Sequence, residues 1–431
     1  MAKNANNKVS IWQSLHNAWK VQDIRKKLIY TFFMLILFRL VGVIPAPGVD
    51  YIRVKSAMSG TNLPLLDLVN MMTGSNFSNM TIMAMGITPY INSSIIMQLL
   101  TIAIPALERL SKSGPDGQKK IASITRYVTV VLAVIQAIGL VYSLGYIKSG
   151  WFNTVLVGVS MAAGTALAMW IGERITEKGL GNGVSLLIFA GIISNLFNGF
   201  TSLIANAFSA TSLTPWLTLL AVLLFALVMI VVVTFVDMGV RRIQVQYAKR
   251  VTGRKMYGGQ SSILPLKVCS VGVMPLIFAY SFMAFPSTLI QLFGGSESGL
   301  GLWWSRYMNY YSPLYMIVTA LLIIAFTYFY TSISFQPDEM AKNIQQQGGV
   351  IPHVRPGKPT ADFLARTNNR LTLFAALFLA VLATLPNLFT VGLQTSVPFA
   401  ASSLLIAVSV VLETKRQLDD LLVSRNYDTL T

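Results

Sequence analysis

The stretch GITPYINSSIIMQLL, residues 86–100, lies inside an apolar run long enough to cross a bilayer, yet it contains a proline, an asparagine, two serines and a glutamine. Lipid cannot satisfy the hydrogen-bonding groups of such side chains. In membrane helices, small and polar residues normally face other helices or water. The stretch therefore predicts a span that faces a packed protein interior or an aqueous path, and its serines alone do not decide between the two.

The rest of the chain has the composition of an integral membrane protein. Of its 431 residues, 54% are hydrophobic and only 11% are charged, whereas about 25% are charged in a typical soluble domain. A hydrocarbon core about 30 Å thick needs roughly 20 apolar residues per helix. The sequence predicts an all-α polytopic membrane protein with ten transmembrane helices, at 28–44, 81–107, 126–147, 151–172, 184–200, 215–236, 268–293, 313–335, 371–393 and 397–412.

The distribution of basic residues predicts the orientation of these spans. When alternate connections between spans are counted together, 28 of the 33 lysines and arginines fall on one side of the membrane and 4 on the other. The remaining one, Arg39, lies within the first span. Cytoplasmic connections are enriched in lysine and arginine. Both termini are therefore expected in the cytoplasm, which agrees with an even number of spans.

The order of the segments predicts two halves. Five spans in each half, at 28–205 and 215–412, would run in opposite directions through the membrane, an arrangement common in transport proteins. Residues 1–27 have the pattern of an amphipathic helix on an anionic inner leaflet, and residues 413–431 form a cytoplasmic tail.

Two long cytoplasmic connections carry turn signals. Residues 237–267 alternate polar and apolar side chains and then reach glycines, which predicts a basic β-hairpin. Residues 336–370 contain a Gly-Gly pair and three prolines that flank Arg355 and Lys358. Connections of this length are usually functional or disordered.

The sequence argues against an enzyme. Its single cysteine and two histidines form no soft-ligand cluster, so we expect no metal and no cofactor. Ion-coupled carriers usually bury acidic or histidine relays, and no carboxylate pair lies at membrane depth. Arg39 is expected to snorkel or to pair with another helix. Two classes of protein remain: a passive conduit through the membrane and a membrane scaffold without a pore. A small-solute secondary carrier is the disfavoured alternative.

Two features favour the conduit. Ile87, Ile91 and Ile95 recur every four residues, and an isoleucine ring can seal a pore by dewetting, although an ordinary packing stripe gives the same spacing. The segment LPLLDLVNMMTGSNFSNM, 63–80, is too short and polar to span. It could fold back as an amphipathic half-helix that fills a cavity reversibly, or form an ordinary outer loop.

Several long motifs resemble the SecY family of protein-conducting channel subunits. They are FRLVGVIPAPG at 38–48, GITPYINSSIIMQLL at 86–100, ITRYVTVVLAVIQAIG at 124–139, GERITEKGLGNGVSLLIFAGI at 172–192, RRIQVQYAKRVTGRKMYGGQSSILPLK at 241–267, QQGGVIPHVRPGKPT at 346–360 and RLTLFAALFLAVLATLP at 370–386. The resemblance runs nearly end to end in a preserved order. It implies an hourglass of two five-helix halves around a central pore, with a gate that opens sideways.

The resemblance also assigns roles to residues. The pore ring would be formed by Ile87, Ile91, Val184, Ile188, Ile277 and Ile406. The lateral gate would carry Ser94, Gln98 and Ser281. An outer plug near 64–74 would contain Leu65, Leu66, Leu68, Val69 and Met72. The docking surface for a ribosome or the SecA motor would include Arg241, Arg242, Lys249, Arg250, Arg254, Lys255 and Arg355. Val184 and Lys358 depart from the usual isoleucine and glutamate of the family.

The resemblance implies a channel that translocates unfolded secretory polypeptides across the bacterial cytoplasmic membrane and releases apolar segments into it. The expected partners are SecE and SecG subunits, the SecA ATPase, the ribosome, signal sequences and secretory precursors, and anionic lipids. A second copy of the chain is a further partner that the resemblance allows.

Overall fold

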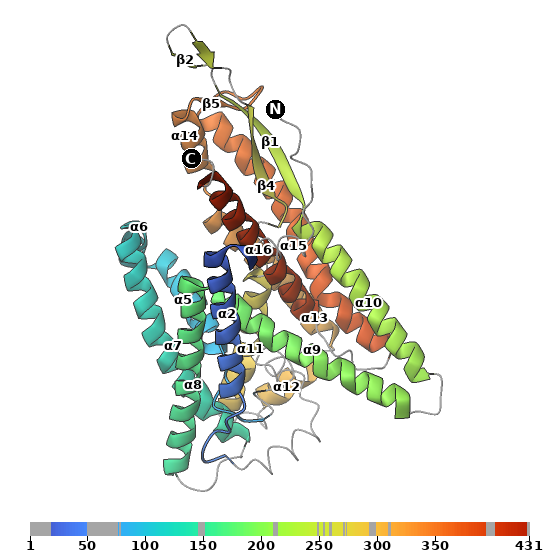
Figure 1. The fold of residues 1–431 in the computed structure, drawn as a ribbon. Coiled ribbons are helices and arrows are strands. Elements are labelled where there is room, and N and C mark those ends of the chain that lie inside the picture. The colour runs from blue at the N-terminus through green and yellow to red at the C-terminus, as the bar shows by residue number, and fades with distance from the viewer. Residues whose placement is uncertain are drawn as a thin grey trace. The chain divides into compact units, whose positions relative to one another are not determined.

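The computed structural model describes residues 19–49, 76, 79–144, 151–209, 214–247, 250–252, 255–257, 261–269, 272, 274–292, 299–308, 312–393 and 401–428. They form two compact units (Figure 1). Unit 1 comprises Met1–Leu219, Ala284–Asn309 and Ile406–Thr431, and unit 2 comprises Leu220–Met283 and Tyr310–Leu405. The predicted plug residues lie outside the described part of the chain.

Unit 1 is built from helices. Among the described residues, the helices that lie entirely within it are α2 (Gln22–Val41), α5 (Thr88–Ala103), α6 (Pro105–Lys112), α7 (Pro115–Leu144), α8 (Trp151–Lys178), α9 (Gly183–Ser209) and α12 (Gly299–Tyr307). Three helices continue from one unit into the other: α10 (Thr214–Asp237), α11 (Met274–Leu292) and α16 (Ala401–Asp428).

Unit 2 combines helices with two small sheets. Its remaining helices are α13 (Pro313–Ser334), α14 (Pro337–Gln346) and α15 (Lys358–Leu393). A three-stranded antiparallel sheet has the order β4-β1-β5, from Ser261–Lys267, Val240–Tyr247 and Gly349–Val350. A separate pair joins β2 (Arg250–Thr252) to β3 (Lys255–Tyr257).

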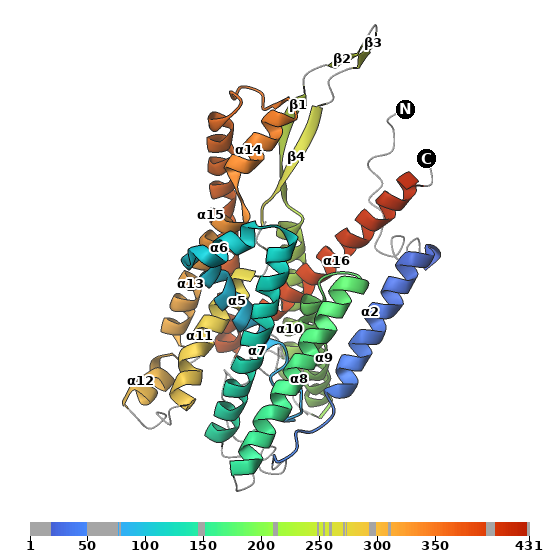
Figure 2. The same cartoon turned by 90° about the vertical axis from the view of Figure 1, so that its left-hand side faces the viewer.

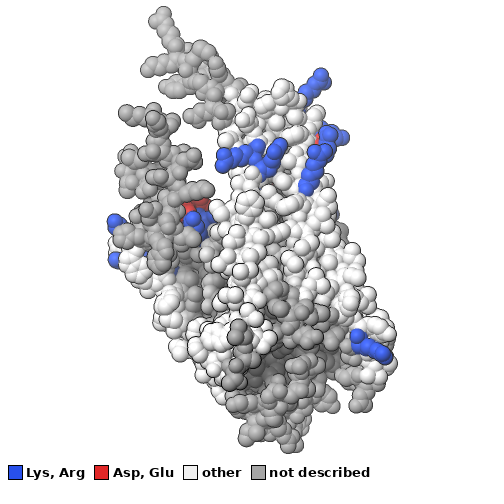
Figure 3. Space-filling model, turned by 90° about the vertical axis from the view of Figure 1, so that its right-hand side faces the viewer, with Lys and Arg blue, Asp and Glu red and all other residues white. Residues whose placement is uncertain are grey.

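The long apolar helices confirm a polytopic membrane protein. Within the described residues, six helices are long and apolar enough to cross a membrane, or seven if the bent pair α5 and α6 counts as one span. Uncharged residues cover most of the described surface on the face drawn in Figure 3. The full set of ten spans stays a prediction.

The predicted span 81–107 is wrong as one continuous helix. Residues 82–87 form turns, Gly86 has a φ of +52°, and α5 begins only at Thr88. The helix axis then bends by 102° between α5 and α6, where Pro105 follows Ile104. Since proline disfavours the helical conformation of the residue before it, Ile104 adopts an extended conformation instead. The apolar composition gave no sign of either break.

The turn before α5 is held by backbone bonds. The Ile82 N–H donates to the Ile44 carbonyl at 2.9 Å, and the Ala46 N–H donates to the Met80 carbonyl at 3.0 Å. This irregular segment also packs closely on α8, because a Cβ added to Gly164 would lie 2.0 Å from the Ile82 carbonyl oxygen. Its backbone groups are thus satisfied within the protein rather than by lipid.

The helix ends differ from the predicted span limits. Helix α7 begins at Pro115 rather than near 126, α15 begins at Lys358 rather than 371, and α16 extends to Asp428 rather than 412. The predicted surface helix over 1–27 lies mostly outside the described residues, and α2 already begins at Gln22. Several helices therefore continue beyond the apolar stretch that identified them.

Candidate channel-lining and cytoplasmic docking sites

The predicted β-hairpin in 237–267 is confirmed and has an additional strand. β1 pairs antiparallel with β4 along its length, with Val240 opposite Lys267 and Gln246 opposite Ser261. On its other side, Gln246 and Tyr247 of β1 pair with Val350 and Gly349 of β5. The second long connection therefore contributes a strand to the same sheet, which the sequence did not predict.

A hydrophobic cluster fixes this sheet to the helices of unit 2. Its fully buried members are Ile243, Val245, Leu266, Ile344, Ile351 and Leu364. They come from β1, β4, α14, the residue after β5, and α15. Figure 2 shows α14 beside β1 and β4. We call this assembly of the three-stranded sheet, α14 and the first turns of α15 the platform.

The platform presents predicted docking residues to solvent. Arg241 and Arg242 on β1 and Arg355 after β5 are exposed. The Thr360 hydroxyl donates to the Arg355 carbonyl at 2.8 Å and holds the backbone of that turn. The backbones of Arg250 and Lys255 lie in β2 and β3. Lys249 and Arg254 lie outside the described residues.

The predicted ring residues occupy sheltered positions. In unit 1, Ile87, Ile91, Ile188 and Ile406 are each at most 8% exposed, and Val184 is half-buried. In unit 2, Ile277 is 7% exposed. Ile87 lies in the turn that caps α5 and is not inside the helix. Burial fits both a closed ring and ordinary packing, so the ring stays a prediction.

The polar residues of the opening stretch have separate surroundings. Ser93 is fully buried, and its hydroxyl donates to the Pro89 carbonyl at 2.8 Å. Ser94 is half-buried and Gln98 is exposed on the same helix. Ser281 of α11 is half-buried in unit 2. The lateral gate to which these residues were assigned also stays a prediction.

The start of α9 packs tightly on α8. A Cβ added to Gly183 would lie 1.9 Å from the Gly172 carbonyl oxygen. The Gly183 N–H donates to the Thr176 hydroxyl at 2.9 Å. The close approach of the two helices requires glycine at 183, so the position of the next residue, Val184, is set by direct backbone contact.

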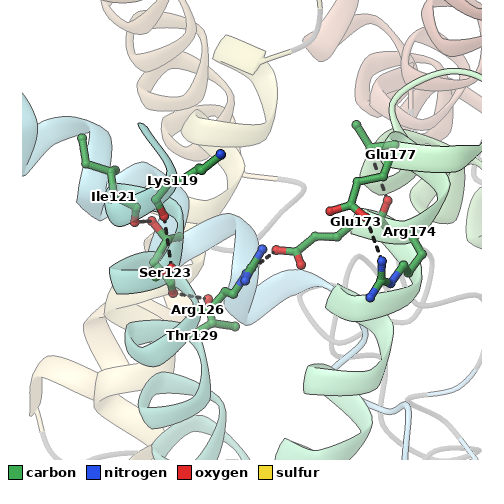
Figure 4. A network of polar contacts seen from close by, with 11 residues as sticks. Lys119, Ile121, Ser123, Arg126, Thr129, Glu173, Arg174 and Glu177 are labelled. Carbon is green, nitrogen blue, oxygen red and sulfur yellow. Dashed lines mark hydrogen bonds and ion pairs between the residues drawn. The ribbon is translucent and has the colours of Figure 1, made fainter. Parts of the chain in front are cut away.

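An ion pair joins α7 to α8 (Figure 4). Arg126 Nε lies 2.7 Å from Glu173 Oε1. The next residue of α8, Arg174, pairs with Glu177 at 2.9 Å, and the Arg174 guanidinium lies over the Trp170 ring. The sequence signalled these charges only as basic and acidic residues near span ends, because pairing between helices depends on how they pack.

No group of three or more histidine, cysteine, aspartate or glutamate side chains suited to a metal ion occurs among the described residues. The arrangement offers apolar surfaces, a few satisfied polar groups and a basic platform. Such groups can bind another molecule through apolar and charged contacts.

Comparison with known proteins decides the family. The SecY family model matches residues 81–415. The chain belongs to the SecY family. It is 41% identical to a protein translocase subunit SecY from Streptomyces scabiei, over 95% of this chain and 98% of the relative. It is also 39% identical to the SecY subunit of Corynebacterium glutamicum, over 96% and 98% of the two chains.

Solved structures share the SecY-family fold. A structure described as that of a protein conducting channel gives a TM-score of 0.69 at 20% identity, with 92% of each chain covered. Sec61 in the canine ribosome-channel complex from the endoplasmic reticulum gives a TM-score of 0.65 at 18% identity, again with 92% of each chain covered. These likenesses show that the chain shares the fold of these proteins.

Proposed function

We propose that this chain is the channel subunit of a bacterial protein translocase, which passes unfolded secretory polypeptides across the cytoplasmic membrane and releases apolar segments sideways into it. Membership of the SecY family and near full-length likeness to protein translocase subunits support this function. The channel itself catalyses no reaction. Energy would come from the SecA ATPase or from translation.

The observation that carries the proposal is the short length of α5 and the irregular segment that precedes it. Its 16 residues extend about 24 Å at 1.5 Å per residue, less than a hydrocarbon core of about 30 Å. The segment before it is irregular and bonded to residues 44–46. Irregular backbone at membrane depth is tolerated only where it is buried in protein or lines a water-filled cavity. A helix that begins part-way through the membrane suits the wall of a conduit.

The finer architecture belongs to the same proposal. Ten spans in two inverted halves would surround a pore closed by the six apolar ring residues, with the plug near 64–74 on the outer side. Ser94, Gln98 and Ser281 would line the lateral gate. Both termini and the platform would face the cytoplasm, as the distribution of basic residues indicates.

The platform would be the contact surface for the motor or the ribosome. Arg241, Arg242 and Arg355 are exposed on a scaffold with its own buried core. Arginine forms strong hydrogen bonds with phosphates and carboxylates. SecE and SecG subunits, anionic lipids and a second copy of the chain complete the proposed partners.

Crosslinking of an arrested precursor tests the channel function. Cys269 is replaced by serine, a cysteine is introduced by Ile91→Cys, and a translocation-arrested secretory precursor carries one cysteine of its own. We expect a disulfide between the two only when the signal sequence is intact. The matched control is Ile96→Cys, because Ile96 lies on the exposed side of the same helix. Absence of a crosslink from both Ile91→Cys and Ile188→Cys, with precursor insertion intact, would refute the pore assignment.

A further inference from the structure

Helix α2 contacts the connection between α8 and α9. The Leu180 N–H, in the turn between these helices, donates to the Thr31 hydroxyl at 3.0 Å. The same hydroxyl donates to the Lys27 carbonyl one turn earlier in α2, at 2.9 Å. Thr31 is 8% exposed and Leu180 is 4% exposed. This contact fixes the chain immediately before α9 begins.

A second contact joins α2 to α9 itself. The Arg39 guanidinium donates from Nη2 to the carbonyl oxygen of Ala190. Arg39 is the charge that the sequence placed inside the first span, and its bond shows that it pairs with another helix. A charged group at membrane depth is costly and is usually retained for a function.

The two contacts of α2 bracket the start of α9. Thr31 and Arg39 are eight residues apart, about 12 Å along the helix axis. Between Leu180 and Ala190 lie the first two turns of α9, which carry Val184 and Ile188. Figure 2 shows α2, α8 and α9 side by side within unit 1.

Helix α8 holds the same two turns from another side. The Gly172 carbonyl touches Gly183, and the Thr176 hydroxyl accepts a bond from the Gly183 N–H. These contacts secure the beginning of the segment at Gly183. At the far end, the Arg39 guanidinium binds the carbonyl oxygen of Ala190, two residues beyond Ile188.

We propose that Arg39 is a positioning residue for the seal of the channel. By binding the Ala190 carbonyl it fixes the rotation and depth of the α9 turns that carry Val184 and Ile188. The inference rests on the proposed pore ring. An apolar constriction seals by excluding water, so a small displacement of one side chain opens it to water and ions. A charge-assisted hydrogen bond is stronger than a neutral one and suits this task.

Thiol labelling of the idle channel tests this role. Full-length chain carrying Cys269→Ser and Ile188→Cys is kept in membrane vesicles with its natural partner subunits. A small, charged, membrane-impermeant methanethiosulfonate reagent is added, and the labelling rate of the introduced cysteine is measured per channel. In wild-type background the rate should be low, because Ile188 is 5% exposed.

Arg39→Leu should raise the labelling rate about tenfold or more, the scale expected for loss of a charge-assisted bond. Halide flux per channel through the vesicle membrane should rise with it. Arg39→Lys keeps a charged donor and should lie between wild type and Arg39→Leu. The matched control Arg174→Leu removes one positive charge from an exposed position of α8 and should change neither rate.

A purely structural role of Arg39 would lower the amount of chain without changing the rate per channel. Unchanged labelling and halide flux in Arg39→Leu would therefore overturn the inference. If that variant does not accumulate, Thr31→Val and Arg39→Lys are measured instead, since each weakens one of the two contacts that α2 makes around the start of α9. Wild-type labelling rates in both variants would also overturn the inference. The precursor crosslink to Ile91→Cys is independent of Arg39. Its failure together with that of Ile188→Cys would refute the pore ring, whereas unchanged labelling with an intact crosslink refutes only the role of Arg39.

Discussion

Gln246 of β1 pairs with Val350 of β5 in an antiparallel sheet, although more than 100 residues separate them in the chain. The pair joins the two long connections of unit 2. A disturbance in one connection is therefore expected to reach the exposed arginines of the other.

Gly349→Val should separate β5 from β1. An added Cβ at Gly349 would lie 2.9 Å from both Tyr247 Cε1 and Val245 Cγ1. Overpacking of this kind costs about 1–3 kcal/mol, so local opening of the platform should increase several-fold to about a hundredfold. The measurement is the rate of limited tryptic cleavage within 237–267. Val350→Thr changes an exposed neighbour and should leave the rate unchanged; equal rates for both variants would contradict the packing argument.

Neutralising the platform arginines should change the salt dependence of ribosome binding. If Arg241 and Arg242 contact ribosomal RNA, the double variant Arg241→Gln/Arg242→Gln should lower the magnitude of the slope of log K against log salt by about 0.7–0.9 per lost phosphate contact. Binding is measured by titrating ribosomes at several salt concentrations. Arg306→Gln, on α12, serves as the control. A weaker affinity with an unchanged slope would exclude direct phosphate contacts.

Gly183→Ala should destabilise the α8–α9 contact severely. Its added Cβ would meet the Gly172 carbonyl oxygen at 1.9 Å, and a backbone atom cannot rotate away. Because the two helices must move apart, we expect a loss of about 3 kcal/mol or more. Thermal denaturation of the purified complex measures the effect. Gly299→Ala is the matched control, since no atom lies within 4 Å of its added Cβ. Similar melting temperatures for the two variants would disprove the close approach.

The Arg126–Glu173 ion pair should contribute only modestly to stability. The side chains are 46% and 24% exposed, so water screens the pair, and we expect a coupling of about 0.5–1 kcal/mol. A double-mutant cycle with Arg126→Gln and Glu173→Gln measures it by denaturation. The exposed pair Lys119 and Asp116, 3.8 Å apart, should give a coupling near zero. Equal coupling free energies in the two cycles would show that the Arg126–Glu173 pair stabilises the protein no more than an exposed pair does.

Gln98→Leu should relax the selection of signal sequences. In the proposed gate, the polar amide of Gln98 stabilises the closed state until a signal sequence intercalates. Its loss should raise export of a precursor with a defective signal sequence, measured against export of the intact precursor. Ile96→Leu, on the exposed side of α5, should have no effect. Unchanged stringency in Gln98→Leu would exclude the proposed role.

The opening stretch shows how far a one-dimensional pattern can predict structure. Its polar residues predicted a helix that faces protein or water; Ser93 is fully buried, whereas Gln98 is exposed, so the prediction stays open. The pattern missed the turn at 82–87 and the bend at Ile104. Hydropathy reports which residues lipid can accept, whereas helix ends depend on local backbone geometry at Gly86 and Pro105.

The platform also combines features that a local sequence pattern predicts with features that only the tertiary structure shows. Alternating residues in β1 and the following glycines predicted the hairpin, because strand periodicity and turn chemistry are local properties. The two-residue strand at Gly349–Val350 carries no periodicity and became a strand only through its partner β1. Its position is decided by the cluster beneath it, where Ile344 and Ile351 pack with Val245.

The sequence by itself determined the membrane class, the expected orientation, the hairpin within 237–267 and, through long ordered motifs, the family. These properties follow from composition, charge distribution and short-range pattern, each of which is readable along the chain. Only the tertiary structure decided that Arg39 binds Ala190, that Gly183 touches Gly172 and that Gln246 pairs with Val350. Contacts between residues distant in the chain depend on the packing of whole helices and strands, which no local pattern specifies.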